Sequence, residues 1–240
     1  MNKFLSQICL LKKRSKSSNP LSNQANKYFS KVRMFRYHEH GGKLSTLPID
    51  IYMKNIEISQ HVIGMISIFE IVLKNKIDAV LSPLNYLDSS SGILSKQQYG
   101  EIASLDKKIN KRSDAPRDIR SRRLSNLTLG FWCSLFEDKK LWSKHLCKIF
   151  EKEIRQTYQI THSKILRITR DVRELRNNIA HHDRILFKKD KYLGTTVDEM
   201  VEITLNLIDS KDIEFKNYMG KELLKKKRAI EKIKGSFMNM

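Results

Sequence analysis

The chain has 240 residues, 40% of them hydrophobic, which is enough to bury the core of one ordinary domain or two small ones. Lys and Arg outnumber Asp and Glu by 46 to 26, so the formal net charge is +20. The cysteines, Cys9, Cys133 and Cys147, have no CxxC spacing, so the sequence supports neither a disulfide framework nor a structural zinc site.

The positive charge is concentrated in three segments. Residues 1–43 contribute +9, residues 107–123 contribute +6, residues 221–234 contribute +5, and the remaining residues sum to zero. Clustered Lys and Arg side chains release counterions from a phosphate backbone, so this distribution indicates a nucleic-acid binder. The alternative interpretation is that the three segments are solvated tails and helix faces.

The chain is predicted to be all-α, because proline and glycine are scarce and strand-like alternation is rarely sustained. We expect a basic, flexible arm over 1–24, whose apolar start is too short to span a membrane. A helical bundle is expected over 25–218, with a loop-rich basic insertion at 83–125, and a basic helix within 219–240. The predicted helices cover 27–37, 50–82 (one helix or two), 95–112, parts of 124–153, 161–186, 196–209 and 219–234, and "HGGK" at 40–43 is predicted to be a turn. We expect a cytoplasmic protein.

Apolar residues at near-helical spacing predict the core. The candidates are Ile63, Ile66, Val72, Leu73, Ile77 and Val80 in the first long helix, and Leu127, Phe131, Leu135, Leu141, Leu146 and Phe150 after the insertion. Trp132 and Trp142 are predicted to pack in this core rather than to stack on bases, and Cys133 and Cys147 to be small core residues.

The segment "RELRNNIAHHDRI", residues 173–185, lies in the predicted helix 161–186. That helix has an apolar stripe with steps of 3, 4, 3 and 4, formed by Ile165, Ile168, Val172, Leu175 and Ile179. At 100° per residue, Asn177 and His181 fall on the polar face, four residues apart. His182 falls about 60° from the centre of the stripe, so it is predicted to lean toward the core.

The polar face of this helix predicts phosphodiester chemistry. It presents Arg173, Arg176, Asn177, His181 and Arg184. A guanidinium can bind a phosphate oxygen and stabilise growing negative charge, and an imidazole can take or give a proton near neutral pH. No cluster of Asp, Glu and His has the spacing of a metal cage, so no metal and no cofactor are expected. Glu174 and Asp183 are isolated acids, which we expect to face solvent or to pair with nearby arginines. The alternative interpretation treats Arg173 and Arg184 as solvated charges and His182 as a structural histidine.

Three segments together resemble a known family. "LRNNIAHHDRILF" resembles the signature of the HEPN superfamily, in which an Arg and a polar residue precede a His, and more closely that of its Abi-like (abortive infection) branch. "LPIDIYMKNIEISQHVIGMISIFEIVLKNKID" resembles the branch's helix with Glu and an (R/K)N pair, here Glu70, Lys74 and Asn75. "LTLGFWCSLFEDKKLWSKHL" resembles its "GFW" segment. The match covers about residues 28 to 190, while the loop from 83 to 125 and the C-terminal basic helix have no counterpart.

The resemblance implies a HEPN-like bundle with endoribonuclease activity that needs no metal, acting as a toxin in bacterial phage defence. It implies that Arg176, Asn177 and His181 are catalytic, with His182 as a further candidate, and that two chains form one composite site. The expected products are a 2′,3′-cyclic phosphate and a 5′-hydroxyl, and an RNA or protein antitoxin is the expected partner. No membrane partner is expected.

Further cations are predicted to bind the RNA outside the catalytic set. They are Arg173, Arg184, Lys74, Arg120, Arg122, Arg123, Lys225, Lys226, Lys227 and Arg228. The alternative function is a non-catalytic RNA-binding or assembly module that uses the same face to grip RNA without cutting it.

Overall fold

The computed structural model describes residues 20–44, 47–110, 119–187 and 191–238. The protein is all-α, as predicted, and the described residues form helices and turns without a strand. The chain divides into two compact units, one of Met1–Ile58 with Ile233–Met240 and the other of Ser59–Lys232. These limits differ from the expected boundaries at 24/25 and 218/219. We describe each unit by itself.

The first unit is built on α2 (Pro20–Phe29), α3 (Lys31–Leu44) and the first turns of α4 (Pro48–Leu81). The predicted single helix over 27–37 is wrong, because Ser30 adopts a left-handed φ of 65° and separates α2 from α3. The predicted turn at 40–43 is also wrong, since α3 continues through it. Of the expected flexible arm, residues 20–24 are helical, and residues 1–19 lie outside the described part of the chain.

Aromatic side chains hold the first unit together. Tyr37 meets Tyr52 edge to face at 5.3 Å between ring centroids, and Phe29 lies 5.0 Å from Tyr52. Met34, Tyr37 and Tyr52 are buried. Edge-to-face and tilted rings at these separations are the favoured geometries for aromatic pairs.

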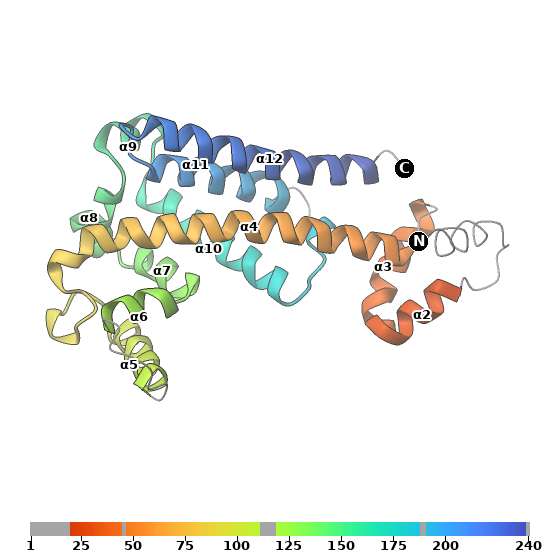
Figure 1. Ribbon diagram of the computed structural model, residues 1–240, viewed down its shortest axis with the longest axis horizontal. Helices are drawn as coiled ribbons and strands as arrows, with labels where there is room; N and C mark the ends of the chain where they lie inside the picture. Colours follow the sequence, from red (N-terminus) through yellow and green to blue (C-terminus); the bar gives the residue numbers. More distant parts are fainter. Residues whose placement is uncertain (1–19, 45–46, 111–118, 188–190, 239–240) are drawn as a thin grey trace. The chain divides into compact units, whose positions relative to one another are not determined.

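The second unit contains the rest of α4 and all the later helices up to Lys232 (Figure 1). In chain order its elements are η2 (Ser82–Leu84), η3 (Ser89–Ser91), α5 (Lys96–Asn110), α6 (Ile119–Asn126), α7 (Leu129–Ser134), η4 (Leu135–Glu137), α8 (Lys139–Lys144), η5 (Leu146–Ile149), α9 (Lys152–Thr157), α10 (His162–Ala180), η6 (Ile185–Phe187), η7 (Lys191–Thr196), α11 (Val197–Leu207) and α12 (Ile213–Met238). Residues 50–81 therefore lie in one helix, and the predicted helix at 219–234 is part of a longer one.

The short helices after the insertion form the core beneath α10. Trp132 and Trp142 are both buried, which confirms them as packing residues, and the indole Nε1 of Trp132 donates to the carbonyl of Leu127 at 3.3 Å. The six core candidates of this segment, Leu127 through Phe150, are all buried. Cys133 is buried, whereas Cys147 is only half-buried. α10 packs directly against α7, η4, α8 and α11.

The apolar stripe of α10 is confirmed over four of its five positions. Ile165, Ile168, Val172 and Leu175 are fully buried, and Ile179 is half-buried where the helix approaches its end. Thr161 caps the N-terminus, accepting a hydrogen bond from the N–H of Lys164 at 3.2 Å. The stripe fixes which face of α10 points into the core, and so which face is left for the polar residues.

The long helix α4 is apolar on more than its buried face. Ile66, Leu73 and Ile77 are buried as predicted, but the prediction for Ile63 is wrong, because 36% of its surface is exposed. Val72 and Val80 are half-buried. By length and composition alone, Pro48–Leu84 could cross a membrane, a property that the core helix of a soluble protein shares. The apolar composition of α4 therefore does not identify which of its faces is buried.

Candidate functional site at the end of α10

α10 ends at Ala180, six residues earlier than predicted. His181 is the C-cap, and His182 adopts a left-handed φ of 54°. The N–H of His182 donates to the carbonyl of Ile179 at 2.9 Å, and the N–H of Asp183 donates to the carbonyl of Asn178 at 2.7 Å. These two bonds form a Schellman motif, which satisfies carbonyls at the helix end and turns the chain away from the helix axis.

This early end changes the position of His182 but not that of His181. The N–H of His181 still bonds the carbonyl of Asn177 at 2.9 Å, so the helical relation between Asn177 and His181 holds. His182 has left the helix, so its predicted helical phase does not apply, and its side chain is exposed rather than turned to the core. The prediction of a core-leaning His182 is therefore wrong.

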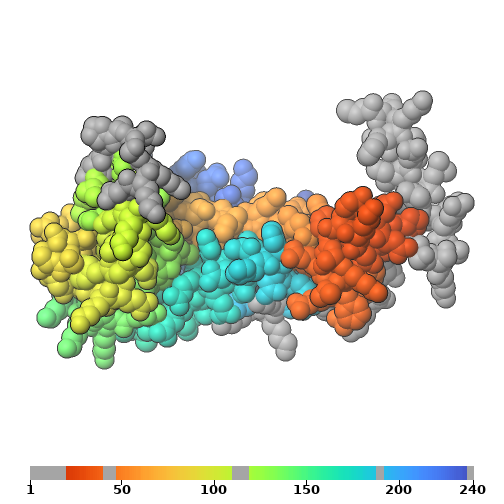
Figure 2. Space-filling model, turned by 90° about the horizontal axis from the view of Figure 1, so that it is seen from below, coloured from red at the N-terminus to blue at the C-terminus, as the bar shows by residue number. Residues whose placement is uncertain are grey.

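The four predicted catalytic residues share one exposed surface at this helix end. Arg176, Asn177, His181 and His182 are all exposed. On the face shown in Figure 2, the turquoise side chains of α10 reach the surface of the second unit. Among the described residues, no side-chain hydrogen bond or ion pair occupies Arg176 or His181. Both groups are therefore accessible to a ligand.

Glu70 of α4 lies beside this surface. The sequence placed Glu70 in one of the three motifs but assigned it no role. Burial raises its pKa, while the charges of Lys74 and Arg176 and a hydrogen bond from the backbone N–H of Leu129 act to lower it. The carboxyl group of Glu70 thus lies near Lys74, one turn along α4, near Arg176 of α10 and near Leu129, the first residue of α7. The "GFW" segment, the Glu–Lys pair and the Arg–His motif meet around it.

Arg173 is held one turn before Arg176 by α7 and η4. Its guanidinium lies 3.9 Å from the carboxylate of Glu137, an exposed pair that contributes little to stability. Its Cδ lies 4.0 Å from the position that a Cβ on Gly130 would occupy. Beneath it, burial raises the pKa of Cys133 to about 12, and the charge of Arg173 opposes this rise. Arg173 therefore packs over the "GFW" segment.

The predicted RNA-binding arginines of α6 have partners within the fold. Arg120 pairs with Asp78 at 2.5 Å and lies 5.9 Å from the ring centroid of Tyr86. Arg123 grips both carboxylate oxygens of Asp106, at 2.9 and 2.7 Å, and also bonds the carbonyl of Leu87. Arg122 is half-buried and has interactions of its own. The structure does not bring these residues to the end of α10.

The predicted basic cluster of α12 divides into engaged and exposed side chains. Lys227 pairs with Asp198 at 2.7 Å, and the Nζ of Lys226 lies 3.3 Å from where a Cβ on Gly64 would be. Lys225 and Arg228 are exposed. Lys74 and Arg184 are half-buried, and the Nε of Arg184 is buried without a hydrogen-bond partner in the described part of the chain. Only some of the predicted cations are therefore free for phosphate.

Tyr192 was missed by the sequence reasoning. It lies in η7, is buried, and donates its hydroxyl to the carboxylate of Glu174 on α10. Burial, together with this bond, raises the pKa of Tyr192 to about 12. Glu174 is exposed, as predicted, and its carboxylate also accepts this hydrogen bond, which anchors η7 against α10. The separation of 18 residues left no local signal for this pair.

No family model, curated protein or solved structure matches this chain. Within the described ranges, no group of three or more His, Cys, Asp or Glu side chains is placed to hold a metal ion. What the site offers is an exposed guanidinium and an exposed imidazole within a turn and a half of helix, with further cations on both sides. Such a set can hold a phosphate and exchange a proton with it.

Proposed function

We propose that this chain is an Abi-like protein of the HEPN superfamily, a metal-independent endoribonuclease that acts as a toxin in bacterial phage defence. The observation that supports the proposal is the meeting of the three resembling segments. Glu70 with Lys74, the backbone of Leu129 and the motif residue Arg176 share one neighbourhood, although α4, α7 and α10 are far apart in the sequence. A positively charged surface without a function would not require these three segments to lie together.

In the proposed reaction, Arg176 binds a non-bridging oxygen of the scissile phosphate and stabilises the charge that grows there. His181 takes the proton of the 2′-hydroxyl or gives one to the leaving 5′-oxygen, so that the 2′-oxygen–phosphorus bond forms while the 5′-oxygen bond breaks. Asn177 orients the phosphate. The products are a 2′,3′-cyclic phosphate and a 5′-hydroxyl.

We propose that two chains form the working enzyme, so that a base and an acid come from facing copies of the motif. The exposure of His182 offers a second route, in which both histidines belong to one chain. Mixing inactive Arg176→Ala and His181→Ala chains distinguishes the two, since activity returns on mixing only when the site is composite. An RNA or protein antitoxin would restrain the enzyme.

One observation favours a second candidate, an RNA-binding module that does not cut. Among the described residues, no partner fixes the imidazole of His181, and catalysis gains from an oriented base whereas binding does not. Exposed cations at a helix end can hold a phosphate without further chemistry. The two candidates make the same prediction for binding and opposite predictions for cleavage.

The test is cleavage of single-stranded RNA in EDTA by wild type, Arg176→Ala and His181→Ala. We expect each variant to lose about 100-fold or more in kcat/KM, because each removes a charge-stabilising or proton-transferring group. Arg170→Ala is the matched control, since Arg170 is an exposed arginine of α10 outside the motif. Wild-type cleavage in both variants, or no cleavage in any protein that still binds RNA, would overturn the enzyme.

A further inference from the structure

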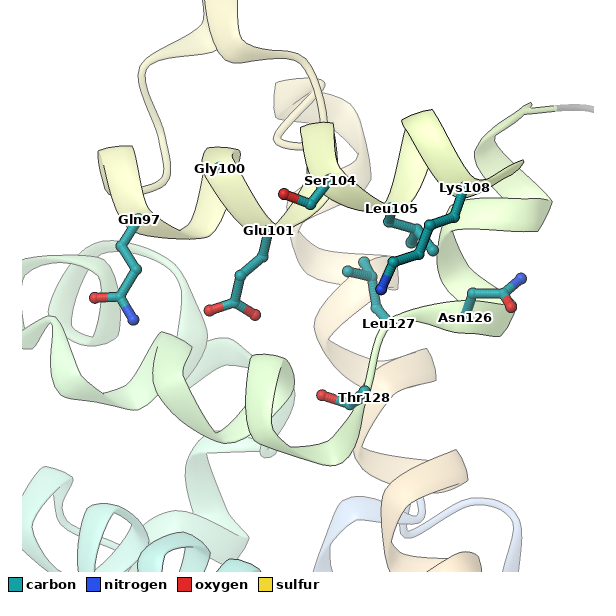
Figure 3. A pocket seen from close by; sticks show the side chains of 9 residues that line it. All are labelled: Gln97, Gly100, Glu101, Ser104, Leu105, Lys108, Asn126, Leu127 and Thr128. Atoms are coloured by element: carbon teal, nitrogen blue, oxygen red, sulfur yellow. The ribbon is translucent and has the colours of Figure 1, made fainter. Parts of the chain in front are cut away.

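A groove of about 510 Å³ opens in the second unit between α5 and the connection from α6 to α7. This volume lies within the range of small-molecule sites, about 300 to 1,000 Å³. Figure 3 shows Lys108 reaching from α5 toward Leu127, and Glu101 pointing to the same side of α5. The groove is thus lined by an acidic and a basic side chain, Glu101 and Lys108, and by the apolar side chains of Leu105 and Leu127.

The groove adjoins Arg173, which lies one turn before Arg176 on α10. The hydroxyl oxygen of Thr128, which lines the groove, lies 3.5 Å from the position of a Cβ on Gly130, and the Cδ of Arg173 lies 4.0 Å from that same position. Both atoms are therefore within 4.0 Å of one point. A strand of RNA whose phosphate is held by the α10 arginines would have a neighbouring nucleotide within reach of the groove.

We propose that this groove binds one base of a single-stranded RNA, next to the phosphate held at the end of α10. The inference rests on the proposed function and adds a base preference to it. Leu127 offers an apolar surface to the face of the base, and Lys108 offers a cation to its phosphate. The carboxylate of Glu101 accepts hydrogen bonds only, so it favours a base with an exocyclic amino group, which offers two N–H donors, over uracil, whose single donor is the imino N3–H. Adenine, cytosine and guanine carry that group, and uracil does not.

A substitution at Gly100 blocks the groove without disturbing the fold. Gly100 lines the groove, and a Cβ there would meet no atom within 4 Å, so this position accepts a side chain, and the ring of Gly100→Phe is expected to fill the groove. Gly235→Phe is the matched control, since Gly235 is also helical, also has nothing within 4 Å and does not line the groove. Glu101→Ala removes the proposed acceptor, and Glu153→Ala removes an exposed carboxylate elsewhere.

The experiment measures fluorescence anisotropy of labelled 2′-O-methyl octamers of A, C and U, which cannot be cut by attack of a 2′-oxygen. Wild type should bind the A and C octamers several-fold more tightly than the U octamer. Gly100→Phe should weaken the A and C octamers several-fold, to the affinity of the U octamer, and leave the U octamer nearly unchanged. Glu101→Ala should bring the three affinities together, while both controls keep the wild-type order.

Equal wild-type affinity for the three octamers, or an unchanged order in Gly100→Phe, would overturn the groove as a base site. Because these oligomers are not cleaved, the result is independent of the cleavage test. Base selectivity without cleavage would remove the proposed enzyme and keep the groove, and cleavage without base selectivity would do the reverse.

Discussion

Two arginine-rich regions of the second unit carry similar charge in the sequence and use it differently. In α6, Arg120 and Arg123 are each paired with a carboxylate from another element, Asp78 and Asp106. At the end of α10, Arg176 is exposed and its acidic neighbour, Glu70, has a raised pKa. A paired arginine joins helices and presents little net charge to a phosphate, whereas an exposed one remains available. The net charge of a sequence segment therefore does not distinguish paired arginines from exposed ones.

The substitution with the largest expected effect is Arg123→Ala, which tests the role of a paired arginine. We expect it to lower the free energy of unfolding by about 2 kcal/mol, because the variant leaves Asp106 and the carbonyl of Leu87 without their donor. Urea denaturation measures the loss. The folded variant should cleave RNA as wild type does, and Arg170→Ala should change stability by less than about 0.5 kcal/mol. A stable Arg123→Ala that fails to bind RNA would show that the distinction between paired and exposed arginines is wrong.

The second test applies the same distinction to α12. Replacing both Lys225 and Arg228 with alanine should reduce the slope of log affinity against log salt by about 1.4, since each lost contact to single-stranded RNA accounts for about 0.7. Affinity should be measured over a range of salt concentrations. Lys227→Ala should leave the slope nearly unchanged and lower thermal stability instead, because Lys227 pairs with Asp198. Equal slopes for wild type and the double variant would return this helix to a role in solubility.

The third test concerns the turn that ends α10. His182→Gly should raise the free energy of unfolding by about 1 kcal/mol, because glycine adopts a left-handed φ without the steric cost that a Cβ imposes. Thermal or urea unfolding detects the gain. His181→Gly should give no such gain, since His181 has a φ of −90°. If His182→Gly is destabilised instead, the exposed imidazole makes a stabilising contact.

The smallest expected effect is a pH dependence from Glu70. Because its folded pKa is raised above the ordinary value of 4.5, its contribution to stability is present at acid pH and is lost as pH rises through the raised value. Wild type should therefore lose stability relative to Glu70→Gln as the pH rises above the ordinary value of 4.5, by about 2 °C in Tm. The opposite sign would mean that Lys74 and Arg176 outweigh the cost of burial.

The apolar stripe of α10 and the buried tryptophans were predictable because burial imposes a local period on the sequence. The end of α10 was not predicted, since the cap uses His182 in the left-handed position where glycine is the usual signal. A signal was present in the spacing, because the next large apolar residue after Ile179 is Ile185, which breaks the rhythm of three and four.

The pairing of the cations could not be predicted from the sequence. Arg120 and Asp78 are 42 residues apart, and no local pattern identifies which acid an arginine will meet once the helices pack. The exposure of Ile63 was missed for a related reason, since α4 is apolar over much of its circumference and its composition does not define the buried face. The candidate residues, Glu70 among them, were predictable as motifs, while the positions of Glu70 and Glu137 beside the arginines of α10 required the fold.

The buried thiol beneath Arg173 has a kinetic consequence. The thiolate is the form that reacts with alkylating agents and oxidants, and burial raises the pKa of Cys133 to about 12. Modification at Cys133 therefore has to wait until α7 separates from its neighbours, whereas the half-buried Cys147 does not depend on that event. The rate of modification of Cys133 thus measures how often the structure opens locally beneath Arg173.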